Sequence, residues 1–284
     1  DDVESRGLGD VYKRQVHNIE YQGRYGRETL EDLFGLDRGW FDGGTIEFSG
    51  DVNLLKGAIV TADAVTAVSP TYAQELKYAY FAHGLENVMN MNARKLHGVL
   101  NGIDMQRYDP AHDKNLAASY LPGDLAGKQA DKAALQRMLG LQERADTPVL
   151  AMVSRLVSHK GLDLVCETLD AFMGKDVQFV VLGKGDGKYE SFFSWAQAKY
   201  PGRVAVHLGY SESLAMQIYA GADLFLMPSK SEPCGLSQMI AMRYGAVPIV
   251  RETGGLKDTV HAYEAWNCLL YTSTSTRDST SSRM

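Results

Sequence analysis

Residues 224–237 read LFLMPSKSEPCGLS, an apolar run followed by a polar turn and then by a helical pattern that begins at Ser237. A short apolar run bounded by such a turn favours a buried strand that ends just before Pro228. Open α/β sheets bind ligands at the carboxyl ends of their strands, close to the N–H groups of the next helix. Glu232, the acid in this turn, is therefore our first candidate for the active site, although the helix dipole alone also favours an acid there.

The same strand, turn and helix pattern repeats on both sides of this turn. Strands are predicted at 148–153, 177–182, 204–208, 224–227 and 247–250, and helices at 161–173, 189–199, 211–219 and 236–244. Strands that alternate with helices at this spacing indicate βαβ units and a parallel sheet. The sequence thus predicts a Rossmann-like domain over residues 148–267.

Composition narrows the class of protein. The chain has 284 residues, of which 45% are hydrophobic, so it can bury the core of one large domain or of two ordinary ones. Its formal net charge of -6 argues against a nucleic-acid partner, which usually requires Lys and Arg concentrated on one face. No apolar run approaches a membrane span, and no signal peptide is visible. Cys166, Cys234 and Cys268 follow neither a metal-binding nor a disulfide spacing, which favours a reducing cytosol, while the oligomeric state stays open.

The two termini contain hexapeptides that are related to each other. Residues 10–15 read DVYKRQ, which the codons GAT-GTG-TAT-AAG-AGA-CAG encode; the complementary strand, read one base in, encodes CLLYT and then S, the sequence of residues 268–273. This pairing indicates an inverted DNA tag such as a transposon end, although unrelated polar termini are also common. We therefore expect residues 1–15 and 268–284 to be non-native, with a disordered tail, and exclude both from the fold.

The first part of the chain is less regular. Apolar residues at helical spacing predict one helix over 46–62, which a buried strand follows at 63–69. A further helix is predicted at 72–80, with Ser69 or Thr71 as its N-cap.

Residues 95–104 are predicted to form a strand that runs into Asn101–Gly102, a pair that favours positive φ and a tight turn. The composition then becomes polar and charged, with a helix at 131–139, so we expect a linker and helix over 106–147. Residues 16–105 are expected to be the remnant of another domain, because no strand precedes His17.

Two pairs of residues at the predicted strand ends suit an anionic ligand. Arg155 and Lys160 follow the first strand of the repeat, beside the helix that Gly161 opens, where cations and N–H groups suit a departing phosphate. A solvated surface pair is the alternative. Gly183 and Gly185 follow the second strand and either let a nucleotide or phosphate approach the backbone or form an ordinary turn.

The remaining strand ends carry weaker candidates. Tyr210 follows the third strand and either stacks on a base or is a half-buried aromatic at a turn. Cys234 could be a nucleophile, but an unpaired cysteine is more often a small packing residue. After the fifth strand, Thr253 can hydrogen-bond an anion, and Gly254 and Gly255 form another turn that permits close approach.

Six motifs occur in order at 17–23, 67–76, 99–104, 153–164, 231–238 and 252–260: HNIEYQG, AVSPTYAQEL, VLNGID, VSRLVSHKGLDL, SEPCGLSQ and ETGGLKDTV. Together they resemble the bacterial glycogen synthase and plant starch synthase family of retaining glucosyltransferases. The resemblance implies an α/β fold of GT-B type, in which two Rossmann-like domains face a cleft. Here the N-terminal, acceptor-side domain would be incomplete and the C-terminal, nucleotide-sugar-binding domain nearly complete.

The resemblance also implies a reaction. Glucose would be transferred from ADP-glucose, or alternatively UDP-glucose, to the non-reducing end of an α-1,4-glucan, glycogen or starch, with retention of configuration. No metal or other cofactor is expected. The location would be the cytoplasm of a bacterium or the plastid of a plant.

Individual residues match the motifs of the family. Arg155 and Lys160 match the pair that binds the diphosphate of the donor and stabilises the departing nucleoside diphosphate. Glu232 matches the acid that contacts the donor glucose, His17 the histidine near the transferred glucose, and Tyr210 the aromatic next to the base. The residues matched to the turns around the sugar and the diphosphate are Cys234, Gly235, Leu236, Thr253, Gly254 and Gly255.

The chain also departs from the pattern of the family. The Lys-x-Gly-Gly-Leu donor loop, an aspartate before His17 and the last C-terminal helix are absent, so we expect this chain to be inactive or nearly so and its parent to be active. Ile240 stands where many related transferases carry a second acid, which fits this narrower family. The alternatives are another retaining transferase of the same fold, of sucrose or lipid-sugar type, and a nucleotide-sugar or glucan-binding module without turnover.

Overall fold

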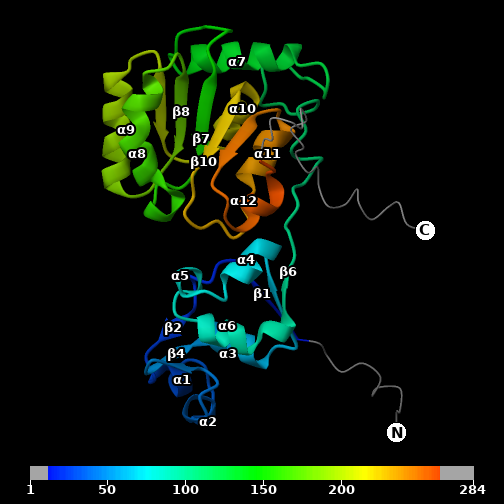
Figure 1. Cartoon of the computed structure of the whole chain (residues 1–284), viewed down its shortest axis with the longest axis vertical. Helices are drawn as coiled ribbons and strands as arrows, with labels where there is room; N and C mark the ends of the chain where they lie inside the picture. The colour runs from blue at the N-terminus through cyan, green and yellow to red at the C-terminus, as the bar shows by residue number, and fades with distance from the viewer. Residues whose placement is uncertain (1–11, 263–284) are drawn as a thin grey trace, which may run out of the picture. The chain divides into compact units, whose positions relative to one another are not determined.

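The computed structural model describes residues 12–262, which belong to two compact units divided between Asn101 and Gly102 (Figure 1). This division lies slightly before the expected boundary at 105/106, and residues 106–147 belong to the second unit. Most of the residues that we expected to be non-native lie outside the described range, including all of 268–284. Within residues 12–262, no helix is both long and apolar enough to cross a membrane.

The second unit is built on a five-stranded parallel sheet of order β11-β10-β7-β8-β9. Its strands are β7 (Val149–Val153), β8 (Gln178–Gly183), β9 (Val204–Leu208), β10 (Leu224–Met227) and β11 (Val247–Val250). The helices between them are α8 (Leu162–Met173), α9 (Gly187–Lys199), α10 (Glu212–Gly221) and α11 (Ser237–Arg243). Each of these elements begins and ends within about two residues of its predicted bounds, so the predicted alternation is confirmed.

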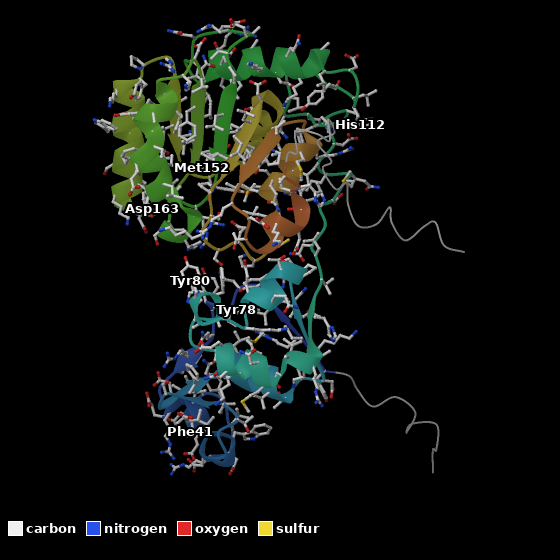
Figure 2. The ribbon with its side chains drawn as sticks, in the orientation of Figure 1. Phe41, Tyr78, Tyr80, His112, Met152 and Asp163 are labelled. Carbon is white, nitrogen blue, oxygen red and sulfur yellow. The ribbon has the colours of Figure 1, made fainter. Side chains whose placement is uncertain are left out.

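Burial on both faces of the sheet explains the continuous apolar runs. Successive side chains of β8 point to opposite faces: Phe179 and Val181 pack in the cluster that contains residues of α8 and α9. Val180 and Leu182 pack in the cluster that contains residues of α10 and α11. Figure 2 shows the side chains of this unit, including buried Met152 of β7. The sheet is thus fixed by two separate apolar layers.

The segment before β7 is packed onto the second unit. It contains α7 (Ala126–Met138), which begins earlier than the helix predicted at 131–139. Leu135 of α7 belongs to the same buried cluster as residues of α10 and α11. Buried Lys128 donates from Nζ to backbone carbonyls at the ends of these two helices: those of Ala220 at 2.7 Å, Ala222 at 2.8 Å and Tyr244 at 2.9 Å, with a longer contact to that of Tyr219 at 3.4 Å.

The first unit has a smaller parallel sheet of order β1-β5-β6 and an antiparallel sheet of order β2-β4-β3. Its strands are β1 (Lys13–Val16), β2 (Arg24–Tyr25), β3 (Glu47–Phe48), β4 (Asp51–Asn53), β5 (Ala64–Ala67) and β6 (Leu96–Gly98). Its helices are α1 (Thr29–Asp32), α2 (Gly39–Asp42), α3 (Leu54–Thr61), α4 (Pro70–Glu75), α5 (Ala79–Ala82), α6 (Glu86–Met91) and the 3-10 turn η2 (Ala93–Lys95). Phe41, labelled in Figure 2, belongs to a small buried cluster of this unit.

The exclusion of residues 13–15 from the fold is wrong. With Val16 they form β1, which pairs in parallel with β5 from Lys13↔Ala64 to Val16↔Ala67. A strand therefore precedes His17. Only Val16 of this strand is buried, so the strand is held by backbone hydrogen bonds and not by a row of apolar side chains. For this reason no apolar pattern in the sequence predicts the strand.

The single helix predicted over 46–62 is also wrong. Ser49 and Gly50 both have positive φ, 56° and 85°, and make a turn between β3 and β4. The helix α3 begins only at Leu54, because the Asn53 side chain accepts a hydrogen bond from the N–H of Lys56 at 2.9 Å and acts as the N-cap.

Two further local predictions can be compared with the structure. Ser69 is the N-cap of α4, since its Oγ accepts from the N–H of Tyr72 at 3.1 Å, but the helix predicted over 72–80 is split into α4 and α5. Neither Asn101 nor Gly102 has positive φ and residues 99–104 contain no turn, so the tight turn predicted there is wrong. This pair instead marks the division between the two units.

Candidate active site

Sheet order brings two of the predicted charged residues together. β7 and β10 are neighbours, with Leu224 opposite Leu150, so the turns that follow these strands adjoin at one edge of the sheet. Lys160 lies in the 3-10 turn η3 (Ser158–Lys160) after β7, and Glu232 lies in the turn after β10. The Nζ atom of Lys160 is 2.6 Å from Oε2 of Glu232, which makes an ion pair between two strand ends.

Glu232 is buried and held by a second donor. The residue is only 6% exposed, and Ser229, 1% exposed, donates from Oγ to the same Oε2 atom at 2.8 Å. A buried carboxylate requires such partners, because an unpaired charge is costly away from water. The other carboxylate oxygen, Oε1, has no hydrogen-bond partner among residues 12–262. Ser229 was not predicted from the sequence; its position three residues before the acid, within one turn, is the signal that could have pointed to it.

Two contacts tie the turn after β10 to η3 and to the start of α8. The N–H of Lys230 donates to the carbonyl of His159 at 2.8 Å, and Nζ of Lys230 donates to Oδ2 of Asp163 at 2.5 Å. The Lys230 ammonium holds the pKa of the Asp163 carboxyl below its ordinary value. Asp163 lies in the first turn of α8, at the end labelled in Figure 2. The loops that carry Lys160 and Glu232 are therefore held in register with each other.

A glycine permits this close packing. Gly161 has a φ of +71° and lies between η3 and α8. A Cβ atom at this position would lie 2.0 Å from the carbonyl oxygen of Pro228, and therefore a larger residue does not fit without moving the backbone.

The turn after β11 packs against the same segment. Gly255 donates its N–H to the carbonyl of Glu232 at 3.0 Å, and a Cβ atom at Gly255 would lie 2.2 Å from the carbonyl oxygen of Cys234. Thr253 is buried and is the N-cap residue of the short helix α12 (Gly254–Thr259). Cys234 is buried as well, which supports its interpretation as a packing residue.

The glycines after β8 also approach protein backbone. A Cβ atom at Gly183 would lie 2.0 Å from the carbonyl oxygen of Ser154, and one at Gly185 would lie 2.3 Å from that of Leu156. Leu156 and Gly185 form a parallel bridge. This geometry favours the reading of Gly183 and Gly185 as turn residues that let the segments after β7 and β8 pack together.

The other candidates are exposed. Arg155 lies two residues after β7, and Tyr210, 87% exposed, lies two residues after β9. Leu236 is half-exposed directly before α11, and Gly235, with a φ of +71°, precedes it. His17 is exposed and follows β1 in the first unit. It is therefore not one of the residues that the strand ends of the second unit bring together.

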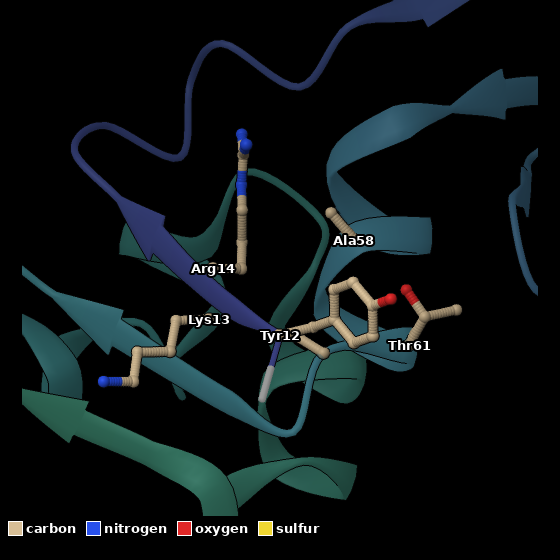
Figure 3. A pocket seen from close by; sticks show the side chains of 6 residues that line it. Tyr12, Lys13, Arg14, Ala58 and Thr61 are labelled. Carbon is tan, nitrogen blue, oxygen red and sulfur yellow. The ribbon is translucent and has the colours of Figure 1, made fainter. Parts of the chain in front are cut away.

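A cavity of about 400 Å³ occurs elsewhere, in the first unit. Figure 3 shows the ring of Tyr12 beside Thr61 of α3, with Lys13 and Arg14 of β1 also lining this space. None of the predicted site residues lines it. In the part of the chain that the structure describes, no group of three or more His, Cys, Asp or Glu side chains could hold a metal ion.

The sequence matches two family models. Residues 14–91 match the model described as starch synthase catalytic domain, and residues 140–279 match glycosyl transferases group 1. The chain is 48% identical over 249 residues to a glycogen synthase of Bacillus cereus (strain ZK / E33L), which covers 88% of this chain and 52% of that protein. It is 52% identical over 248 residues to a glycogen synthase of Geobacillus thermodenitrificans, which covers 87% of this chain and 51% of that protein.

Solved structures give the same result for the fold. The catalytic domain of starch synthase IV from Arabidopsis thaliana superposes with a TM-score of 0.84 at 38% identity, covering 92% of this chain and 55% of that one. Sucrose-phosphate synthase from Thermosynechococcus elongatus shares the fold, with a TM-score of 0.55 at 18% identity, over 91% of this chain and 54% of that one. This chain spans about half the length of the curated relatives it matches. With its α/β fold of GT-B type, the chain belongs to the glycogen synthase and starch synthase family.

Proposed function

We propose that the protein acts in the transfer of glucose from ADP-glucose to the non-reducing end of an α-1,4-glucan, with retention of configuration. The observation that carries the proposal is the contact of Lys160 with Glu232 where β7 and β10 end, in a chain whose relatives are glycogen synthases. The two side chains come from separate strand ends, and one is a cation and the other an acid.

The charges suit the reaction. As the bond to the leaving phosphate breaks, negative charge grows on the diphosphate and positive charge develops on the sugar. In this proposal Lys160 and Arg155 neutralise the departing diphosphate, while the carboxylate of Glu232 faces the glucose. Because two cations lie after β7, we propose that the reaction needs no metal ion or other cofactor.

The choice of substrates is supported by one related structure. The Arabidopsis starch synthase IV domain, 38% identical to this chain, was solved bound to ADP and acarbose, which supports an adenine nucleotide and a glucan as the ligand classes. A protein of Anabaena solved with UDP and glucose shares only the fold with this chain, at 18% identity. We therefore propose ADP-glucose as the donor and keep UDP-glucose as the alternative. The bacterial relatives support a bacterial cytoplasm as the place of action.

Binding and transfer are expected to separate in this chain. Because it spans about half the length of its relatives, we propose that the chain binds the donor through the second unit but transfers little or no glucose, whereas a protein of the relatives' length is active.

The test compares the two proteins directly. Titration calorimetry of the 284-residue chain with ADP-glucose and with UDP-glucose measures binding, and incorporation of labelled glucose into glycogen measures transfer. We expect binding, with ADP-glucose preferred, and transfer only by the longer protein. Failure of the chain to bind either nucleotide sugar would contradict the proposed function. Glucose transfer by the chain at a rate close to that of the longer protein would contradict the proposal that this chain binds the donor but transfers little or no glucose.

A further inference from the structure

The turn after β10 contains a neutral donor to the acid that the proposed reaction uses. Ser229 is almost completely buried, and its Oγ donates to Oε2 of Glu232 at 2.8 Å. Lys160 contacts the same oxygen at 2.6 Å, with its side chain 16% exposed. Both donors thus hold one side of the carboxylate, and Oε1 is left without a partner among the described residues.

The two donors differ in what else they can bind. Lys160 is a cation on a long, flexible stem, and a diphosphate attracts it, so a bound donor competes with Glu232 for it. The hydroxyl of Ser229 is neutral, and its short side chain has no comparable reach. A contact from this hydroxyl therefore persists when Lys160 moves to a phosphate.

The backbone around Ser229 is fixed by contacts that involve neither Lys160 nor Glu232. On one side, the Pro228 carbonyl packs directly on Gly161. On the other side, the N–H of Lys230 donates to the carbonyl of His159 at 2.8 Å. The position of the Ser229 hydroxyl is thus set by the protein and not by a ligand.

We propose that Ser229 is a positioning residue, which holds Oε2 of Glu232 so that Oε1 stays directed to the glucose of the nucleotide sugar after Lys160 has turned to the diphosphate. This inference rests on the proposed function and deepens it. It assigns to Ser229 the recognition of the sugar and not that of the nucleotide.

The experiment measures the affinity of the 284-residue chain for ADP-glucose and for ADP, by calorimetry, in the unsubstituted protein and in Ser229→Ala. The ratio of the two dissociation constants reports the contribution of the glucose. A hydrogen bond to a charged group contributes enough to change an affinity about ten-fold or more. We expect Ser229→Ala to weaken ADP-glucose binding about ten-fold and to change ADP binding less than about three-fold.

A matched control lies two residues away. Ser231 belongs to the same turn and donates no hydrogen bond to Glu232. Ser231→Ala removes the same hydroxyl group from the same loop, so it should leave both affinities within about two-fold of those of the unsubstituted protein. Thermal unfolding of both variants monitors the integrity of the second unit.

The outcomes are distinct. Equal weakening of ADP and ADP-glucose binding would show that Ser229 only maintains the loop. Unchanged affinities for both ligands would show that Glu232 needs no such support. Either result overturns the positioning role while the proposed function stands. If the unsubstituted chain binds neither ligand, the proposed function fails and the positioning role fails with it.

Discussion

Lys160 and Glu232 form an ion pair, although they are 72 positions apart in the sequence. In a donor complex the same two side chains would have different targets, the diphosphate and the sugar. The loss of either one therefore has a second effect, because the remaining charge is left buried without its partner.

Both charges, and that of Arg155, should affect the rate of transfer. In a protein of the relatives' length, Glu232→Gln and Arg155→Ala should each lower kcat/KM about a hundred-fold or more, since one preorganised charge in such a site contributes roughly 3 kcal/mol. Incorporation of labelled glucose into glycogen measures the effect.

Matched controls are available in an exposed ion pair. Arg137 and Glu143 contact each other at 2.6 Å on the surface, before β7 begins. Glu143→Gln and Arg137→Ala should leave the rate within about two-fold of the unsubstituted enzyme. Near-normal rates for both Glu232→Gln and Arg155→Ala would refute the site assignment.

At the residue scale the sequence identified charged candidates but not their contacts. Glu232, Lys160 and Arg155 were found because acids and cations after apolar runs are visible in the sequence. The ion pair was not predicted, because it depends on β10 lying next to β7, and strand order is not encoded by local periodicity. Ser229 was missed because its hydroxyl acts only through Glu232.

At the scale of elements, Lys128 joins three helices of the second unit. It lies on α7 and donates to carbonyls at the ends of α10 and α11. The last four carbonyls of a helix have no intrahelical partner, so the ammonium provides hydrogen bonds at these ends. At Tyr244 it shares this role with the hydroxyl of Tyr120, which donates to the same carbonyl at 3.0 Å. The positive charge of Lys128 also complements the negative ends of the two helix dipoles.

Replacement of Lys128 should therefore destabilise the second unit. Lys128→Met keeps much of the volume but donates no hydrogen bond, so it should lower the free energy of unfolding by about 2–3 kcal/mol. Urea denaturation measures the change. Arg137→Met, at an exposed position of the same helix, is the control and should cost less than about 0.5 kcal/mol. Equal effects of the two substitutions would contradict the role given to Lys128.

The same lysine predicts a dependence of stability on pH. Burial lowers the pKa of Lys128 from 10.5 to about 8 in the folded protein. Between these values the unfolded chain still binds a proton that the folded chain has released, so the free energy of unfolding rises with pH. The difference in unfolding free energy between the unsubstituted protein and Lys128→Met should thus increase from about pH 8 to about pH 10.5. A difference that stays constant or falls over this range would contradict the prediction.

Prediction of the elements succeeded where burial imposes a pattern and failed where a turn residue decides. The strands and helices from β7 to β11 follow the apolar pattern because both faces of the sheet are covered. The predicted helix at 46–62 was wrong because positive φ at Ser49 and Gly50 and the cap at Asn53 override a helical spacing of apolar residues. β1 was missed because three of its four side chains are exposed.

At the scale of the whole molecule, each unit has its own buried side chains. Phe225 and Tyr244 belong to a buried cluster of the second unit, and Leu30 and Phe41 to one of the first. Tyr72 of the first unit accepts a hydrogen bond from the N–H of buried Ile19 at 3.0 Å. We therefore expect calorimetry of the chain to resolve two unfolding transitions.

Substitutions assign these transitions. Lys128→Met should lower the midpoint of one transition only, and Tyr72→Phe, which leaves the Ile19 N–H without its acceptor, should lower only the other, by about 1 kcal/mol in stability. A single transition that both substitutions shift would show that the two units unfold together.

The packing of Gly161 on Pro228 has a consequence for mutational scans. Gly161 carries no functional group. Because it has no side chain, however, the loops that carry Lys160 and Glu232 can pack closely together. A mutational scan that measures only activity would find position 161 as intolerant of substitution as an acid or a cation of the site. Intolerance to replacement there would reflect a steric clash, since an added Cβ would lie 2.0 Å from the carbonyl oxygen of Pro228, and not a chemical role. The indispensable positions of this protein are therefore more numerous than its reacting groups.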